Sequence, residues 1–175
     1  RSDGERLEPT QELSRTCATE YVLQSIFLAC NINIVRVARS KQFARMLDHV
    51  ISKARAGDPE AVRIAKHLMD QLRFLQGLNA APSEESQRCK RVRQSGRHQV
   101  WRLSHAFEPG VAVRTICWFD PSEATVVVAL FFADKASMGD VFYDSVGSRA
   151  DQEIDLWIQK KSRRRSEKDD DQEDG

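Results

Sequence analysis

The sequence lacks the features that mark metal centres, disulfide frameworks and membrane anchors. Its four cysteines stand singly, with no C-x-x-C pair and no histidine at zinc-finger spacing; they are Cys17, Cys30, Cys89 and Cys117. We interpret them as reduced thiols of a cytoplasmic protein. The apolar run at residues 21–30 is far shorter than the roughly 20 residues that a membrane-spanning helix requires, so no membrane contact is expected.

Signature motifs of common enzyme classes are also missing. The glycines form no phosphate-binding loop, and no serine stands in a nucleophile elbow. His49, His67 and His98 are not spaced as metal ligands with a carboxylate partner. The sequence therefore predicts no metal site and no cofactor.

Charge is abundant but balanced. The 27 basic and 26 acidic residues leave a net charge of +1, so the bulk charge does not predict a polyanionic partner. The length of 175 residues and the apolar content of 41% fit one domain with a real core. We expect a poorly ordered or partly helical extension at 1–30, the folded domain at 31–160 and a disordered charged tail at 161–175. The tail is expected because no apolar residue follows Ile158.

Two helices are predicted in succession after a strand at residues 32–37. Ser40 can cap the first helix, whose apolar residues recur at every third and fourth position, and Gly57 ends it. Asp58 and Pro59 then supply an N-cap and a proline at the first helical position. The two helices should form a hairpin with one shared apolar side.

The period of the sequence becomes that of β-strands after residue 88. Turn signals at 95–96, 109–110 and 121–122 separate four strand segments, which cover residues 89–93, 97–107, 111–119 and 125–132. The last segment is apolar on both faces and should be a central strand. A C-terminal helix should cover one of its faces, with the apolar residues Phe142, Val146, Ala150, Ile154 and Trp157. The predicted fold is α+β, with an N-terminal strand and helical hairpin packed on an antiparallel β-sheet and a closing C-terminal helix.

Basic residues gather on the predicted sheet. They are Lys90, Arg91, Arg93 and Arg97 at the first hairpin, Arg102, His105 and Arg114 on the next two strands, and Lys135 after the central strand. Arg102 and Arg114 should converge on one face, because the turn at 109–110 pairs their strands. Tyr143 follows near the start of the last helix.

This set of groups fits the cleavage of RNA without a metal. The reaction needs a base for the 2′-hydroxyl proton, cations for the charged phosphorane and an acid for the leaving 5′-oxygen. Plainer interpretations stay open for each residue. The arginines could only solvate the outer face of the sheet, Tyr143 could only pack, and His105 could have no role.

Five short segments carry a resemblance to a known family. Residues 100–105 form an apolar-aromatic strand with Arg102, residues 112–116 form a following strand with Arg114, and residues 125–132 form a hydrophobic central strand. Residues 133–135 supply a basic turn, and residues 140–144 place a tyrosine at the start of the last helix. Over residues 31–160 the chain resembles the RelE/ParE toxin superfamily, in particular the RelE-like toxins of bacterial and phage toxin–antitoxin systems.

The resemblance implies a toxin that enters the ribosomal decoding site, cleaves mRNA there and is blocked by a cognate antitoxin. Carried over by position, the site residues are Arg102, Arg114, Lys135 and Tyr143, with His105 as a further candidate. Ser104 stands where many relatives have arginine. Either the neighbouring Arg102 replaces that arginine or the activity is reduced.

The function predicted from the sequence is therefore a metal-independent mRNA endoribonuclease. Tyr143 or His105 would transfer protons, while the cations of the site stabilise phosphate charge and those of the first hairpin bind RNA. One alternative is an inactive or ParE-type relative that acts by binding a protein such as gyrase. The other is a nucleic-acid-binding accessory protein. The tyrosine and the cations together favour the enzyme, whereas their placement on separate faces would favour the relative that acts by binding a protein.

Overall fold

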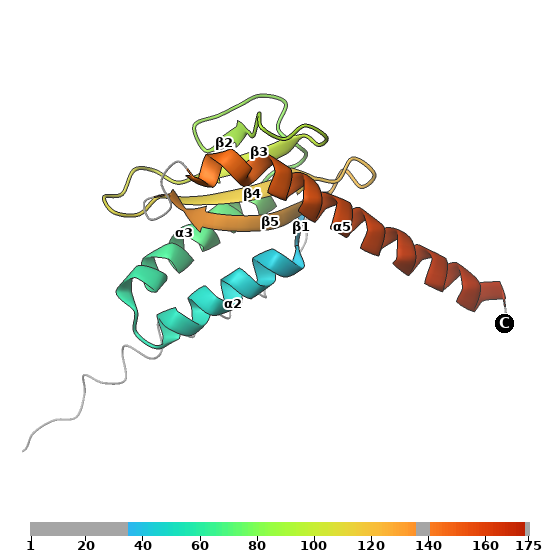
Figure 1. Cartoon of the computed structure of the whole chain (residues 1–175), viewed down its shortest axis with the longest axis horizontal. Helices are drawn as coiled ribbons and strands as arrows, with labels where there is room; N and C mark the ends of the chain where they lie inside the picture. Colours follow the sequence, from blue (N-terminus) through green and yellow to red (C-terminus); the bar gives the residue numbers. More distant parts are fainter. Residues whose placement is uncertain (1–34, 136–140, 174–175) are drawn as a thin grey trace, which may run out of the picture. The chain divides into compact units, whose positions relative to one another are not determined.

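The computed structural model describes the backbone of residues 35–135 and 141–173, with side chains at 35–135 and 145–166. Its elements are β1 (Arg36–Arg39), α2 (Lys41–Arg55), α3 (Pro59–Gln76), β2 (Cys89–Arg91), β3 (Val100–Ser104), β4 (Val113–Phe119), β5 (Val126–Asp134) and α5 (Val141–Glu173) (Figure 1). The α+β class is confirmed. Within these residues, no helix combines the length and the apolar character needed to cross a bilayer.

The helical hairpin begins and reverses where the local signals place it. The Ser40 hydroxyl accepts a hydrogen bond from the Phe43 N–H at 3.0 Å, and the Asp58 carboxylate accepts one from the Glu60 N–H at 2.9 Å. Gly57 has a φ of 88°, a conformation that costs glycine nothing because it has no Cβ. The chain therefore turns sharply between α2 and α3, and both predicted N-caps are confirmed.

The strands form one mixed sheet in the order β1-β5-β4-β3-β2. Strands β2 to β5 are antiparallel neighbours, as predicted, whereas β1 pairs with β5 in parallel. The predicted antiparallel sheet is thus part of a mixed sheet, because the N-terminal strand joins it in parallel. No tight turn joins β1 to β5, so nothing in the connection forces the antiparallel arrangement that a hairpin requires.

Strand β5 is the most buried element of the sheet, since all of its residues from Val126 to Ala133 are buried. Its pairing with β4 shifts register at Leu130, which has no partner between Ile116 and Cys117. At this bulge the Leu130 carbonyl accepts a hydrogen bond from the Ser40 hydroxyl at 2.5 Å, and the Ala129 carbonyl accepts one from the Ser40 N–H at 2.9 Å. The bulge thereby fixes the N-terminus of α2 on the central strand.

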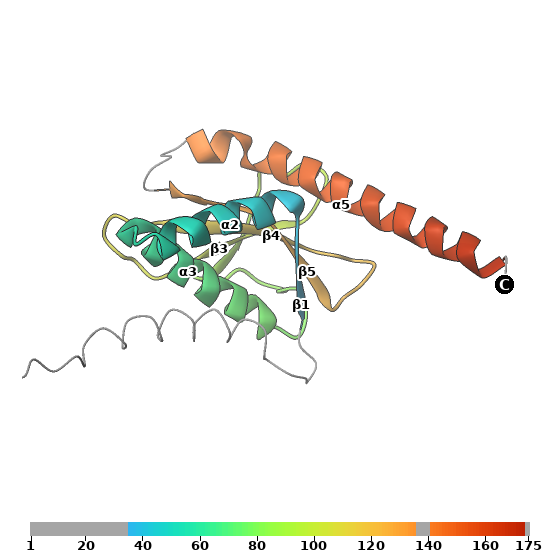
Figure 2. The same cartoon turned by 90° about the horizontal axis from the view of Figure 1, so that it is seen from below.

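Apolar side chains fill both faces of the sheet. On one face the helical hairpin packs on the strands, through Phe43, Leu47, Leu68 and Leu75 against Trp101, Cys117, Ala129 and Phe132. On the other face α5 packs through Val146, Ala150 and Ile154 against Ile116, Trp118, Val128 and Phe131. Figure 1 shows the strands between the α2–α3 hairpin and the first half of α5, and Figure 2 shows the hairpin in front of the strands when the molecule is seen from below. The predicted two-sided cover of β5 is confirmed.

Carboxylates also hold α5 on the segment between β2 and β3. Asp151 accepts hydrogen bonds from the Ser95 hydroxyl at 2.6 Å and the Gly96 N–H at 3.1 Å, and Asp155 lies 2.6 Å from the Arg97 guanidinium. Burial by itself would raise the pKa of Asp151, but the hydrogen bonds outweigh burial and lower the pKa. A hydrogen bond with His98 and the charge of Arg97 lower the pKa of Asp155 as well, so both carboxylates are held in the charged form that these contacts require.

Helix α5 does not end near Ile158. It continues to Glu173, so the expectation of a disordered tail from residue 161 is corrected. The Lys161 ammonium lies 2.6 Å from the Asp120 carboxylate and 2.9 Å from Glu123, both on the connection between β4 and β5. Burial alone would raise the pKa of Asp120, but hydrogen bonds from Lys161 and from the hydroxyl and N–H of Ser122 lower this pKa. The sequence pattern missed this contact because it depends on charge rather than on apolar residues.

A first prediction concerns the close approach of α5 to the segment that follows β2. A Cβ built on Gly147 would overlap the carbonyl group of Gln94 and lie 2.6 Å from the Ser95 nitrogen. On an open helix surface, Gly→Ala stabilises by about 1 kcal/mol. Here we expect Gly147→Ala to lower the free energy of unfolding by roughly 2 kcal/mol, because the helix or the segment must move. Urea unfolding measures the difference.

Gly96→Ala is the matched control for this experiment. A Cβ built at Gly96 has no heavy atom within 4 Å, so its change in unfolding free energy should stay within about 0.5 kcal/mol. Unfolding curves for Gly147→Ala that match those of the control would contradict the docking of α5 described above.

A second prediction separates the two parts of the C-terminal segment. A chain that stops after Lys160 loses the ammonium partner of the buried Asp120 and should lose roughly 1–3 kcal/mol of unfolding free energy. A chain that stops after Ser166 keeps Lys161 and should retain the melting temperature of the full chain. Thermal unfolding followed by circular dichroism compares the two, and equal melting temperatures would show that Lys161 does not anchor the helix.

Candidate functional site

Arg102 and Arg114 lie on the same face of the sheet. Arg102 pairs with Ile116 across β3 and β4, and Arg114 pairs with Ser104 in the same ladder. Because side chains alternate along a strand, Arg102, Arg114 and Ile116 all lie on one side. Ile116 belongs to the cluster under α5, so this is the face that α5 partly covers. Both arginines are half-buried, and Lys90, opposite Arg102 on β2, shares their face.

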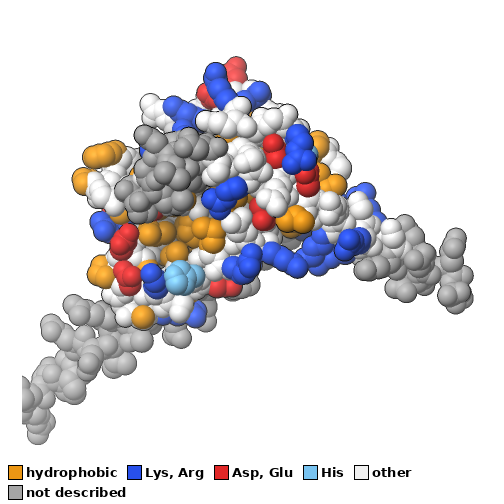
Figure 3. All heavy atoms as spheres, in the orientation of Figure 1, with side chains coloured by type: hydrophobic (Ala, Val, Ile, Leu, Met, Phe, Trp, Pro, Cys, Tyr) orange, Lys and Arg blue, Asp and Glu red, His pale blue; other side chains and the backbone are white. Residues whose placement is uncertain are grey.

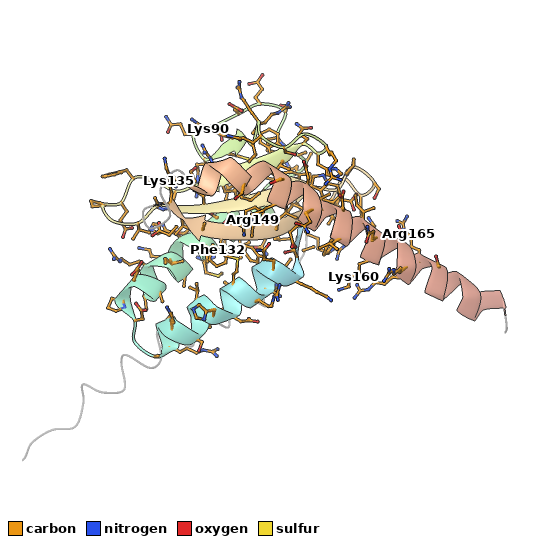
Figure 4. The ribbon with its side chains drawn as sticks, viewed as in Figure 1. Lys90, Phe132, Lys135, Arg149, Lys160 and Arg165 are labelled. Carbon is orange, nitrogen blue, oxygen red and sulfur yellow. The ribbon has the colours of Figure 1, made fainter. Side chains whose placement is uncertain are left out.

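Lys135 follows β5 at the same end of the sheet as Arg114. Its backbone N–H donates to the Ala112 carbonyl at 2.9 Å, and Ala133, two residues earlier, pairs with Arg114. Figure 4 shows Lys135 at this end, close to the beginning of α5. The backbone of Tyr143 lies in the first turn of α5, but its side chain is outside the described residues. Its part in the site stays a prediction.

The other predicted RNA-binding residues do not form one surface. Arg91 pairs with Trp101 on the opposite face and lies over its indole ring at 5.3 Å. Arg93 lies 4.0 Å from Glu85, and Arg97 is engaged by the carboxylates of α5. Of the four, Lys90 alone shares the face of Arg102 by strand register. The assignment of these four residues to RNA binding is still a prediction.

His105 has a structural position in which both ring nitrogens bond to backbone. Nε2 accepts a hydrogen bond from the Val113 N–H at 3.0 Å, and Nδ1 lies 2.6 Å from the Ala106 carbonyl, to which it donates. This pairing fixes the neutral tautomer. Burial lowers the pKa of His105, and the charges of His67 and Arg114 lower it further against the opposing bond to Ala106. The imidazole therefore has no free nitrogen with which to take a proton from a substrate.

His67 and Glu108 complete a polar cluster beside His105. The His67 ring stacks on the His105 ring with centroids 3.7 Å apart, and its Nε2 lies 2.7 Å from the Glu108 carboxylate. Sequence reasoning set His67 aside because it looked only for metal spacing. Among the described residues, no group of three or more histidines, cysteines or carboxylates is arranged to hold a metal ion.

Comparison of the chain with protein families, curated proteins and solved structures gives no match. The functional argument therefore rests on the residues themselves.

Sequence reasoning also missed a second group of cations, at the junction of β1, α2 and α5. Lys41 and Arg45 are four residues apart, and Lys160 and Arg163 are three apart, so each pair lies on one helical face. This spacing was visible in the sequence. Their convergence was not, because more than a hundred residues separate the two pairs along the chain.

A third prediction tests the assignment of His105 to structure. Because folding lowers its pKa below the ordinary value of about 6.5, the unfolded state takes up the proton first as the pH falls. His105 therefore stabilises the fold fully above about pH 6.5, and this contribution is lost as the pH falls toward the lowered pKa. The urea midpoint of the wild type should fall between about pH 7.5 and 5.5 more than that of His105→Gln, whose amide accepts from Val113 without titrating.

The comparison between the two proteins removes the contribution of the other titrating groups, which both contain. The same loss of midpoint in wild type and variant would mean that His105 gains a proton freely and is not held by the backbone.

Proposed function

We propose that this protein is a toxin-like, metal-independent endoribonuclease that cleaves mRNA on the ribosome and is neutralised by a cognate antitoxin. The observation that carries the proposal is the placement of Arg102 and Arg114 on adjacent strands and on one face of the sheet. That placement favours a shared phosphate site over isolated surface charges.

The half-buried position of the two guanidiniums suits them to the transition state. In the proposed reaction the 2′-hydroxyl gives its proton to water as its oxygen attacks phosphorus, and a phosphorane with additional negative charge forms. The bond from phosphorus to the 5′-oxygen then breaks and leaves a 2′,3′-cyclic phosphate, while the 5′-oxygen takes a proton from Tyr143, which water restores. Cations held beside a protein surface stabilise this charge more strongly than cations in bulk water, because the local dielectric is lower. Arg114 forms no ion pair among the described residues, and its Nη1 donates only to the Val113 carbonyl. Its charge is thus not neutralised by a carboxylate of that part of the chain.

The start of α5 adds to this positive potential. A helix N-terminus carries a partial positive charge, and α5 begins at Val141, six residues after Lys135. Tyr143 lies in this first turn and is the residue that we assign to proton transfer. His105 is no longer assigned to that step, because both of its nitrogens bond to backbone. It is a positioning residue that fixes the beginning of β4, on which Arg114 stands.

The second candidate function is nucleic-acid binding without cleavage. It is favoured by the engagement of His105, which leaves Tyr143 as the only proton-transfer group that we assign. A protein of this kind would need the cations but not the tyrosine hydroxyl. The two functions are therefore separated by the same pair of variants.

A fourth prediction compares Arg114→Ala with Tyr143→Phe. A cation that acts on the phosphorane should matter more in the transition state than in the bound RNA, so Arg114→Ala should slow cleavage about 100-fold or more. RNA binding should weaken by less than about tenfold. Tyr143→Phe should slow cleavage and leave folding intact, because only the hydroxyl is lost. Cleavage of mRNA on translating ribosomes and growth arrest after expression are the measurements, with EDTA present to show that no divalent metal is needed.

Arg55→Ala is the matched control, since Arg55 is an exposed arginine at the end of α2. It should leave cleavage unchanged. If the wild-type protein binds RNA but cleaves neither free mRNA nor mRNA on ribosomes, the nuclease function is wrong and the binding function is supported. His105→Gln should retain most of the cleavage activity, and loss of cleavage in a folded His105→Gln protein would return the imidazole to the mechanism.

A further inference from the structure

A groove of about 530 Å³ lies between the beginning of α2 and the middle of α5. One wall is formed by the end of β1 and the first turns of α2, and the other by residues 153–163 of α5. Its cations are Arg39, Lys41, Arg45, Lys160 and Arg163. We call it the α2–α5 groove.

The charge of the α2–α5 groove is not balanced within the described chain. All five cations are exposed, and none of them forms an ion pair with another described residue. Glu153 is the single carboxylate of the lining, which leaves a formal surplus of four positive charges. In the orientation that satisfies both ends of its amide, Gln42 donates to Glu153 and accepts from Arg149. Like charges gathered in this way repel one another, and a bound anion relieves the repulsion.

The cations are arranged in two facing rows. Lys41 and Arg45 follow one face of α2, and Lys160 and Arg163 follow one face of α5. Figure 3 shows lysine and arginine side chains as a continuous band across this part of the surface, and Figure 4 shows Lys160 on α5 near the beginning of α2. The rows are open to solvent along their length. Such rows suit a chain of anionic groups better than a single phosphate, which converging buried donors bind best.

The start of α2 strengthens the positive potential at a fixed place. Ser40 caps this helix and is itself bonded to the carbonyls of Ala129 and Leu130 on the central strand. Ser40, Lys41 and Gln42 line the groove, so the positive end of the helix dipole lies beside it. It adds to the potential of Lys41 beside it.

The described lining offers too few large exposed hydrophobic side chains for an acidic protein partner. Leu156, 52% exposed, is the large exposed hydrophobic residue in the described lining, whereas Trp157 packs against the core under α5. Protein interfaces draw their affinity from clusters of buried aromatic and aliphatic anchors. Cations with few apolar anchors are typical of surfaces that bind a nucleic-acid backbone.

We propose that the α2–α5 groove binds the phosphate backbone of single-stranded RNA, as a contact separate from the site of Arg102 and Arg114. The choice of RNA rests on the proposed function. Between Val141 and Lys160 the axis of α5 rises by roughly 30 Å, so only an RNA of several nucleotides reaches from the start of this helix to the groove. Binding at the groove depends on salt and not on base sequence.

The fifth prediction concerns the double variant Lys41→Gln/Lys160→Gln, which removes one cation from each wall. The matched control is Lys53→Gln/Lys66→Gln, which removes the same charge from exposed lysines outside the groove. Fluorescence anisotropy measures the binding of a labelled uridine-rich RNA of about 20 nucleotides over a range of salt concentrations. The groove variant should bind about tenfold more weakly, and its plot of log K against log salt should be shallower by about 1.4, the loss of two phosphate contacts. The control should bind RNA within about twofold of the wild type, because it changes the net charge of the protein but removes no cation of the groove.

Equal losses in the two double variants would overturn the proposal, because net charge alone would then explain binding. Polyglutamate that competes as well as unlabelled RNA, at equal charge, would overturn it in favour of an acidic protein partner. A wild-type protein that never cleaves, but whose RNA binding falls in the groove variant alone, would sink the nuclease function and leave the groove assignment standing.

Discussion

The attachment of α5 to the sheet is the interaction on which the rest of the arrangement depends. Its apolar face covers β4 and β5, but burial alone does not select one orientation of a long polar helix. Asp151 and Asp155 fix the helix against the segment after β2, and Lys161 fixes it against the connection between β4 and β5. These contacts are charged and point in defined directions, so they set both the rotation and the position of the helix. Gly147 lets α5 come close to the backbone of Gln94 and Ser95, because it has no Cβ.

The position of α2 follows from a defect in the sheet. The bulge at Leu130 turns two neighbouring carbonyls of β5 toward Ser40, whose N–H and hydroxyl satisfy them. The same hydroxyl caps α2, so one serine joins the central strand to the helix. Substitution of this serine would expose the bulge and the helix end together. The geometry of the α2–α5 groove is therefore set by the core on one wall and by the charged contacts of α5 on the other.

The sequence predicted those parts of the fold that local chemistry decides. Caps at Ser40 and Asp58 and the reversal at Gly57 depend on residues close together in the chain. The two-sided burial of β5 was predictable because its own residues are apolar on both faces. The parallel pairing of β1 and the extension of α5 past Ile158 depend on contacts between distant segments, which periodicity does not contain. The sequence therefore did not predict the parallel direction of β1 or the helical continuation of the C-terminal segment.

The candidate site shows the same division at the level of single residues. The alternation of side chains along a strand was enough to predict that Arg102 and Arg114 share one face of the sheet. The same alternation places Arg91 and Lys90 on opposite faces, although the sequence analysis had assigned both to RNA binding. The hydrogen bonds of His105 could not be predicted from the sequence, because its partners are backbone groups rather than side chains with a recognisable spacing. Residue type indicates which chemistry a group can perform. Hydrogen bonding decides whether the group is available for it.

The two groups of cations differ in the environment that surrounds them, and this difference assigns them different parts of one process. Arg102 and Arg114 are half-buried beside the apolar cluster under α5, where a charge acts on a neighbouring anion with less screening. The cations of the α2–α5 groove are exposed, so their attraction is weakened by salt and is shared among many weak contacts. Cations on phosphates that do not react hold the RNA equally before and during the reaction, whereas cations at the reacting phosphate favour the state with the greater charge. Binding energy from the groove should then lower the RNA concentration that is needed, and the sheet arginines should set the rate of the bound complex.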